Sequence, residues 1–462
     1  MGIIAYLARN LTKSQMGGYS LSLVFISLFC VLMCFYVNSG YQRYFFDFER
    51  KERDDYELSL LNILAIIAFS VCSLLWIAES IITPYLFEMS QFHYRLLLLI
   101  PLFYSFTEVI LAKLRSTQKR KILLLLQLAR SSLFFLLLYA FFEYPQLHTF
   151  FNQDPLSAVF LAMLLSFSIF VLYYIKTGPL WRPIINFGKI KAALSFSISF
   201  IPVHMGVMLY LNSDKYMLEK FMTMEVVGIY TAISLITSSI IIALMGPIFD
   251  SFYPIILKEK ENQDFKSAHK IIVFGIQLLA LTLVFTLSIL PKESTLIILG
   301  GKYLPHAKLI FGFIPIVFCQ FLSQLLSYNF HLKNKIWLLA IFELSLAAVN
   351  IMMNLVLIPN FGLKGALVAS AMTMLIKLVL VTLISKRLLP EFSISARNIS
   401  LCLLSALIVS GLHYLCFEGA LLYRIIILIC EYILLAILFY KFLEKQAPEQ
   451  LKHSLKKLIS RP

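Results

Sequence analysis

Charged residues are scarce in this sequence: they make up 14% of the 462 positions, against about 25% in an ordinary soluble domain. The sequence also lacks the common nucleotide and hydrolase motifs, namely G-x-x-x-x-G-K-[ST], H-E-x-x-H, G-x-S-x-G and a G-x-G-x-x-G that follows a strand. The eight histidines are scattered without the spacing of metal ligands. We therefore expect no cofactor, no metal site, no catalytic residues and no ATP-driven step within this chain.

Hydrophobic residues are abundant instead, at 60% of the chain, and the mean hydropathy is +0.84. Apolar runs of about 20 residues, the length that crosses the roughly 30 Å hydrocarbon core of a membrane as a helix, recur along the whole chain. They predict an all-α polytopic membrane protein with about 13 to 14 transmembrane helices. The predicted spans are 19–37, 58–77, 96–112, 122–142, 156–175, 192–211, 226–247, 271–290, 307–328, 337–358, 363–385, 399–415 and 425–442, preceded by a short apolar stretch at 1–8.

The positive charges are unevenly distributed over the joints between the spans. Most of the 40 lysines and arginines fall in joints that would face one side, which the positive-inside rule identifies as the cytoplasm. Both termini are then cytoplasmic, if the first helix is complete. Topology and contact with anionic membrane lipids account for the net charge of +15, so we expect no nucleic-acid partner.

The sequence of one turn occurs twice in the chain. "MGGYSLSLV", which contains Tyr19, matches "VVGIYTAIS", which contains Tyr230, at an offset of 211 (230 minus 19), and the same offset pairs Thr12 with Thr223. The starts of an even number of helices separate the two turns, so both lie on the same side of the membrane. The halves are therefore predicted to be parallel repeats around a central cavity.

The repeat divides the chain into an N-terminal lobe at 1–188, a C-terminal lobe at 189–388, and two extra helices with a basic cytoplasmic tail at 389–462. The second copy of the turn follows a full span, whereas the first follows only 1–8. We therefore expect that the first helix is short or truncated.

Ionisable residues inside the spans are the remaining functional candidates, because each costs about 2.5 to 3.5 kcal/mol at mid-membrane and usually faces a wet cavity or a partner. Arg130 and Lys377 lie deep in apolar sequence. Glu108, Asp250 and Glu343 also lie in or next to predicted spans. Arg9, Arg43, Asp214 and Lys215 lie near helix ends.

Four stretches together resemble the polysaccharide flippases of the multidrug/oligosaccharidyl-lipid/polysaccharide (MOP) exporter superfamily, especially the O-antigen type called Wzx. They are "LARNLTKSQMGGYSL" with "NSGYQRYFF", "LNSDKYMLEKFMTMEVVGIYTAISL", "FDSFYPII" and "NIMMNLVLIPNFGLKGALVASAMT". The resemblance covers nearly the whole chain. It implies two six-helix lobes and two C-terminal helices, in a multi-pass protein of the bacterial cytoplasmic (inner) membrane.

The resemblance also implies a task, which is the transfer of an undecaprenyl-pyrophosphate-linked oligosaccharide, an O-antigen or capsule repeat unit, across the membrane by alternating access. Its expected partners are that lipid-linked oligosaccharide, membrane lipids and other glycan-assembly proteins. Cations would bind the pyrophosphate or sugar acids: Arg9, Arg43, Arg130, Lys215 and Lys377. Acids would couple an ion or pair with those cations: Asp214, Asp250, Glu108 and Glu343.

Other functions fit the same sequence. A multidrug antiporter belongs to the same superfamily and favours acids over cations in its cavity, and a teichoic-acid or lipid II flippase also fits the fold. The enzymatic alternative is a lipid-linked glycosyltransferase that uses the adjacent acids Asp54 and Asp55. Those enzymes keep such acids opposite the cytoplasm, whereas cations in the same joint predict that Asp54 lies on the cytoplasmic side.

Overall fold

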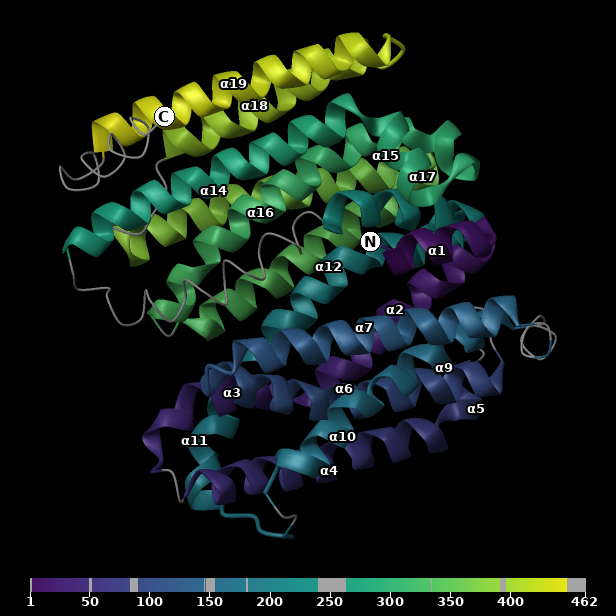
Figure 1. The fold of residues 1–462 in the computed structure, drawn as a ribbon, viewed down its shortest axis with the longest axis vertical. Helices are drawn as coiled ribbons and strands as arrows, with labels where there is room; N and C mark the ends of the chain where they lie inside the picture. Colours follow the sequence, from purple (N-terminus) through teal and green to yellow (C-terminus); the bar gives the residue numbers. More distant parts are fainter. Residues whose placement is uncertain are drawn as a thin grey trace. The chain divides into compact units, whose positions relative to one another are not determined.

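A computed structural model describes residues 2–49, 52–83, 90–144, 146, 154–179, 182–239, 263–333, 335–390 and 396–446 of the 462. Within these ranges the secondary structure consists of α-helices and short 3-10 helices, with no strand (Figure 1).

Eleven of the described helices are long and apolar enough to cross a membrane. One of them, α17 (Ile336–Leu388), has 53 residues and a kink at Gly362, where φ is 56°, close to Pro359. This kink divides α17 into two arms that match the predicted spans 337–358 and 363–385. A shorter apolar helix, Met224–Ser239, begins the predicted span 226–247. The prediction of an all-α polytopic membrane protein is confirmed.

The chain forms two compact units. We call Lys13–Tyr216 with Ala340–Ala347 the N-terminal unit, and Met1–Thr12 with Met217–Leu339 and Ala348–Pro462 the C-terminal unit. The lobe boundaries predicted from the repeat stay a prediction.

The N-terminal unit is built around α6, which contacts α2, α3, α4, α7, α9 and α10. Helix α6 is rich in leucine, and 72% of its most apolar window is buried. The helices of this unit are α2 (Lys13–Cys34), α3 (Val37–Tyr44), α4 (Arg53–Ile77), α5 (Glu79–Ile82), α6 (Gln91–Ser116), α7 (Arg120–Glu143), α9 (Pro155–Ser166), α10 (Ser168–Thr177), α11 (Phe187–Ile198) and α12 (Phe200–Phe221), with the 3-10 helix η1 (Phe45–Asp47).

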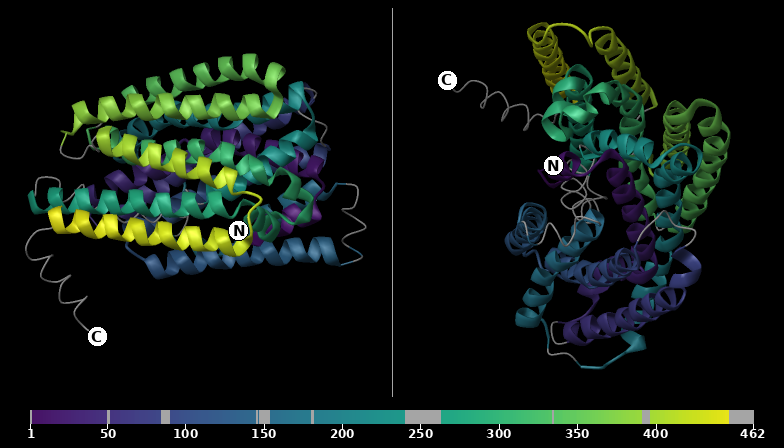
Figure 2. Two further views of the ribbon diagram at one scale, coloured as in Figure 1. Left: turned by 90° about the horizontal axis from the view of Figure 1, so that it is seen from above. Right: turned by 90° about the vertical axis from the view of Figure 1, so that its right-hand side faces the viewer.

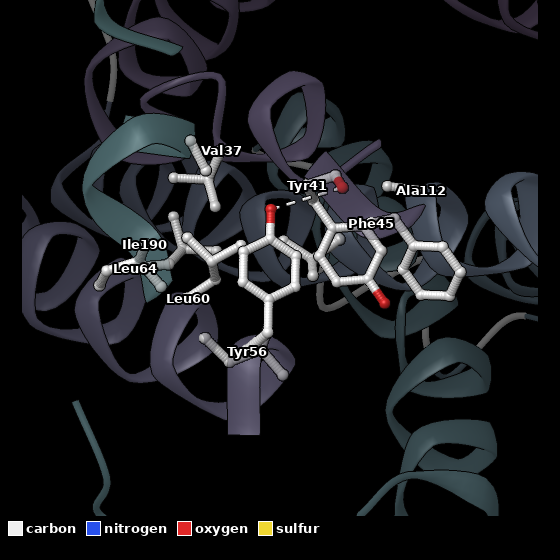
Figure 3. Close-up of a cluster of buried hydrophobic side chains, with 11 residues drawn as sticks. Val37, Tyr41, Phe45, Tyr56, Leu60, Leu64, Ala112 and Ile190 are labelled. Atoms are coloured by element: carbon white, nitrogen blue, oxygen red, sulfur yellow. Dashed lines mark hydrogen bonds between the residues drawn. The ribbon is translucent and has the colours of Figure 1, made fainter. Parts of the chain in front are cut away.

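A tyrosine-rich core holds α3 against α4 and α11 (Figure 3). Tyr41 and Tyr56 are fully buried, and their rings stack 5.6 Å apart. The Tyr56 hydroxyl donates to the main-chain oxygen of Gly40 at 3.1 Å. A Cβ at Gly40 would lie 2.4 Å from the carbonyl oxygen of Ala193, so only glycine allows this approach of α3 to α11.

In the C-terminal unit, α14 (Gln263–Ile289) contacts α16 (Ile310–Leu332), α18 (Ala396–Leu415) and α19 (Leu421–Gln446). Helices α18 and α19 both pack against α14, and Figures 1 and 2 show α19 running along α14. The short α1 (Gly2–Asn10) packs against α15 (Pro291–Leu299), which contacts the 3-10 helix η3 (Gly301–Leu309).

The duplicated turn has the same local structure in both copies. Helix α2 begins at Lys13 and the second helix begins at Met224, positions that the offset of 211 pairs (224 minus 13). In the second copy, the Thr223 hydroxyl accepts a hydrogen bond from the main-chain N–H of Val226 at 3.3 Å, which is an N-cap. Thr12 precedes α2 in the equivalent place. The repeat thus marks two equivalent helix starts.

Candidate functional site

A break in the predicted span 19–37 is the first unusual feature of the N-terminal unit. The span was expected to continue to Val37, but α2 ends at Cys34, and Phe35 and Tyr36 adopt left-handed backbone angles with φ of 50° and 51°. Each such residue costs on the order of 1 to 3 kcal/mol. The Tyr36 ring stacks on His204, with centroids 3.9 Å apart, and this contact holds the break in place.

The break positions Asn38, at the start of α3, beside Glu108 of α6. The Asn38 side-chain N–H donates to a Glu108 carboxylate oxygen at 3.0 Å, and the Tyr104 hydroxyl donates to the same carboxylate. The other polar atom of Asn38, Oδ1, is buried and has no hydrogen-bond partner among the described residues. This amide oxygen is therefore a buried acceptor whose hydrogen-bonding capacity is not satisfied within the protein.

Arg130 of α7 completes this group. Its guanidinium carbon lies 4.4 Å from the ring centroid of Phe167, which also meets Tyr104 edge-on at 6.2 Å. The negative charge of Glu108 is close enough to act on Arg130. We call Asn38, Tyr104, Glu108, Arg130 and Phe167 the α6–α7 polar cluster. It brings together two of the predicted site residues, Glu108 and Arg130, and both are half-buried.

Three other predicted residues lie elsewhere in the N-terminal unit. Arg43 is exposed near the end of α3, with its guanidinium 4.6 Å from the ring of Phe196. On α12, the Lys215 ammonium donates to Asn212 at 3.0 Å, and the neighbouring Asp214 is 3% exposed. The main-chain N–H of Lys215 donates to the Asp214 carboxylate at 2.8 Å, and the charge of Asp214 attracts the Lys215 ammonium.

Glu343 is also buried, at 2% exposure, in the part of α17 that belongs to the N-terminal unit. The Tyr210 hydroxyl of α12 donates to its carboxylate. At this level α12 and α17 touch backbone to backbone, because a Cβ at Gly206 would lie 2.6 Å from the carbonyl carbon of Glu343.

Two predicted residues belong to the C-terminal unit. Arg9 donates to the main-chain oxygen of Ile297 in the last turn of α15 at 2.7 Å, where a cation also stabilises the helix dipole. Lys377 is 3% exposed on α17, one turn beyond Thr373, which accepts a hydrogen bond from Asn350 at 2.9 Å. Asp250 lies outside the described residues.

The sequence reasoning missed a buried ion pair in the N-terminal unit. The Lys113 ammonium lies 2.9 Å from a Glu57 carboxylate oxygen, and the Tyr41 hydroxyl donates to the other oxygen at 3.2 Å. The available signal was that Glu57 directly precedes a long apolar run, which places it inside α4.

A second missed network joins Ser22, His93 and Asp154. His93 Nε2 lies 2.9 Å from the Ser22 hydroxyl, and His93 Nδ1 lies 3.9 Å from Asp154. Ser22 is fully buried and donates its own proton to the Gly18 carbonyl, so it is not an activated nucleophile. Burial raises the pKa of Asp154, but the nearby His93 ring and the hydrogen bonds from Ser157 and Ser90 outweigh it and hold that pKa well below its usual range.

Comparison with protein families adds a decisive observation. The family model described as "Polysaccharide biosynthesis protein" matches residues 1–260, which is more than half of the chain. The chain belongs to the polysaccharide biosynthesis protein family. A search of curated proteins finds no match for the chain.

Solved structures show that this polysaccharide biosynthesis protein has the fold of MOP superfamily transporters. A lipid II flippase, MurJ, in an inward closed conformation matches with a TM-score of 0.66 and 14% identity, over 95% of this chain and 96% of that one. An outward-facing multidrug resistance MATE transporter of the MOP superfamily matches with a TM-score of 0.57 and 12% identity, over 86% of this chain and 94% of that one. The expected resemblance to this superfamily is confirmed for the fold.

In this polysaccharide biosynthesis protein, the two acids that the glycosyltransferase alternative would use lie at the start of a helix. Asp54 and Asp55 lie in the first turn of α4, where negative charge stabilises a helix. Lys189 of α11 lies 3.6 Å from Asp55 and 3.4 Å from Glu52. Among the described residues, no group of three or more His, Cys, Asp or Glu side chains could hold a metal.

Proposed function

We propose that this protein is a flippase that moves an undecaprenyl-pyrophosphate-linked oligosaccharide, an O-antigen or capsule repeat unit, from the inner to the outer leaflet of the bacterial cytoplasmic membrane by alternating access. The family match and the similarity to a structure named as a lipid II flippase support a lipid-linked glycan as substrate. The observation that carries the proposal is the α6–α7 polar cluster, a cation with hydrogen-bonding and aromatic groups inside membrane-spanning helices.

The chemistry of such a substrate gives a reason for a cation, Arg130, inside a membrane-spanning helix. A sugar hydroxyl without a hydrogen-bond partner in hydrocarbon costs several kcal/mol, and a pyrophosphate costs far more. A guanidinium can bind phosphate oxygens with two parallel hydrogen bonds. The unsatisfied Oδ1 of Asn38 can accept from a sugar hydroxyl that reaches the cluster.

Other predicted residues join the proposal with secondary roles. Arg43 is the further candidate for the anionic headgroup, because its exposed guanidinium lies on the same unit. Lys215 and Lys377 remain candidates for charge on the substrate. Arg9 uses its side chain to stabilise the end of α15. Asp214, Asp250, Glu108 and Glu343 are proposed for ion coupling or for pairing with the cations.

Export of glycan tests the proposal. The chain is expressed in a bacterium that lacks its own O-antigen flippase, and surface glycan is measured at matched expression and insertion. Arg130→Gln should lower surface glycan at least tenfold, and Arg130→Lys should retain part of it. Arg120→Gln is the matched control, because Arg120 is exposed at the start of the same helix and should leave export unchanged.

Two results would oppose the proposal. One is full export by Arg130→Gln and by the charge reversals Arg130→Glu and Arg43→Glu. The other is a well-inserted protein that exports no lipid-linked glycan but expels cationic drugs. The second result would favour a multidrug antiporter, a function that the similarity to MATE transporters and the membrane acid Glu108 keep open.

A further inference from the structure

Arg130 is a cation inside a membrane-spanning helix that no acid of the described chain binds. Among the described residues its guanidinium forms no hydrogen bond and no ion pair, and it lies over the ring of Phe167, with 4.4 Å between the guanidinium carbon and the ring centroid. A guanidinium carries five N–H donors. No described side chain or carbonyl satisfies these donors of Arg130.

A suitable acid is close by. The charge of Glu108 acts on Arg130, and a guanidinium and a carboxylate attract each other strongly where the effective dielectric constant is low. The two groups also match in shape, because a guanidinium can donate two parallel hydrogen bonds to one carboxylate. Their separation in this structure therefore has a structural cause.

Two neutral donors occupy the Glu108 carboxylate instead. The Tyr104 hydroxyl donates to it, and the side-chain nitrogen of Asn38 donates to it at 3.0 Å. Tyr104 and Glu108 are four residues apart on α6, so their contact is local to one helix. Asn38 comes from α3, which packs against α6. Asn38 is therefore the partner of Glu108 that the tertiary structure supplies.

The break after α2 places Asn38 at this point. Asn38 is the second residue of α3, directly after the left-handed Tyr36 and Val37. The Tyr36 ring stacks on His204 of α12, and Nδ1 of His204 lies 3.0 Å from the main-chain oxygen of Phe200. These contacts hold the start of α3, and with it the Asn38 amide, beside α6.

We propose that Asn38 is a positioning residue: by holding Glu108, it keeps the Arg130 guanidinium unpaired and able to bind phosphate oxygens of the substrate. This inference rests on the proposed function, because it concerns the anionic headgroup of a lipid-linked substrate. Asn38 acts through two other side chains and needs no contact with the phosphate. Without its hydrogen bond, Glu108 can turn toward Arg130, and the substrate must then displace a carboxylate before it binds.

The binding of two lipids to the full-length protein tests this role. Undecaprenyl pyrophosphate and undecaprenol share their apolar chain and differ in the headgroup, and native mass spectrometry of the detergent-solubilised protein gives both dissociation constants. Their ratio measures recognition of the pyrophosphate and cancels changes in binding of the apolar chain. Wild type should bind the pyrophosphate lipid about tenfold more tightly or better, and Arg130→Gln should lose most of this preference.

Variants of Asn38 separate positioning from a general structural role. Asn38→Leu is close in size but has no hydrogen-bonding group, and Asn38→Ala removes the same bond without added volume. Both should lower the preference toward the value of Arg130→Gln. Addition of Glu108→Gln to either variant removes the competing carboxylate and should restore the wild-type preference. Structural damage at Asn38 would not be repaired by that second substitution.

Asn62→Leu is the matched control. Asn62 lies on α4 of the same unit, and its side-chain nitrogen donates to the main-chain oxygens of Arg182 and Ile184 at 2.7 and 2.9 Å. The substitution removes a buried amide with two hydrogen bonds but none to Glu108. It should therefore leave the ratio of the two dissociation constants at its wild-type value.

Three results would overturn the inference: a wild-type ratio in Asn38→Leu, a loss that Glu108→Gln does not restore, or a wild-type protein that prefers the pyrophosphate lipid no more than Arg130→Gln does. The export assay gives a separate answer. The expected binding pattern without export of glycan would contradict the flippase and leave the role of Asn38 standing. Export with an unchanged ratio in Asn38→Leu would contradict that role and leave the flippase standing.

Discussion

The Lys113 ammonium and the Glu57 carboxylate meet at 2.9 Å inside the N-terminal unit, where the Glu57 side chain is 3% exposed and the Lys113 side chain 25% exposed. They join α6 to α4, and Tyr41 of α3 adds a third helix through its hydrogen bond to Glu57. The pair therefore holds together the helices that surround the α6–α7 polar cluster.

Breaking this pair from one side should destabilise the protein. Lys113→Met leaves the Glu57 carboxylate buried without its cation, and we expect a loss of about 3 kcal/mol, the lower part of the range for buried pairs because Lys113 is partly exposed. Denaturant unfolding in detergent measures the loss. The double variant Glu57→Gln with Lys113→Met should recover part of it, since no charge is then stranded; equal losses in both would contradict the account.

The backbone contact at Gly206 makes a steric prediction. Gly206→Ala places a Cβ 2.6 Å from the carbonyl carbon of Glu343, so α12 and α17 must separate locally. We expect a cost of about 1 to 3 kcal/mol. Gly411→Ala is the control, because a Cβ there meets nothing within 4 Å, and it should be neutral or slightly stabilising. Thermal unfolding of both variants in the same detergent checks the difference.

Asp154 gives a pH-dependent prediction. Its carboxylate caps α9 by accepting from the Ser157 N–H at 3.1 Å, and its pKa is held low. Its contribution is therefore present above the unfolded value of about 3.9 and is lost as the pH falls through the lower folded pKa. Asp154→Asn keeps an N-cap oxygen and removes only the charge, so it should cost about 0.3 to 1 kcal/mol at neutral pH. The gap from wild type should close in strong acid; a gap independent of pH would count against a charge effect.

Two charge contacts at the turn between α18 and α19 should differ sharply in their contribution to stability. Arg424 is 4% exposed and bidentate to Glu293, so Arg424→Met leaves Glu293 without its cation and should destabilise the protein by about 3 kcal/mol. The carboxylate of Glu418 is exposed and solvated, so Glu418→Gln should leave stability nearly unchanged. Melting temperatures of the two variants, measured side by side, test the contrast; similar shifts would refute it.

Much of the candidate site could be anticipated one residue at a time. Arg130 and Glu108 were candidates because a charge inside an apolar run is costly wherever the helix lies. Asn38 and Tyr104 could not be singled out, because an uncharged amide or phenol costs less free energy to bury in a membrane than a charge does, and both kinds of side chain are common in this protein. The break at Phe35 and Tyr36 has no glycine or proline to signal it; its stacking on His204, which is far away in the sequence, stabilises it.

The sequence by itself determined the class of the molecule, the positions of its spans and the repeat that places equivalent helix starts at Lys13 and Met224. Those properties depend on local length, hydropathy and charge. Only the tertiary structure decided which polar groups meet: Asn38 with Glu108, Lys113 with Glu57, and His413 with Glu431. These partners lie on different helices, and helix packing, which no local spacing encodes, brings their side chains within hydrogen-bond distance.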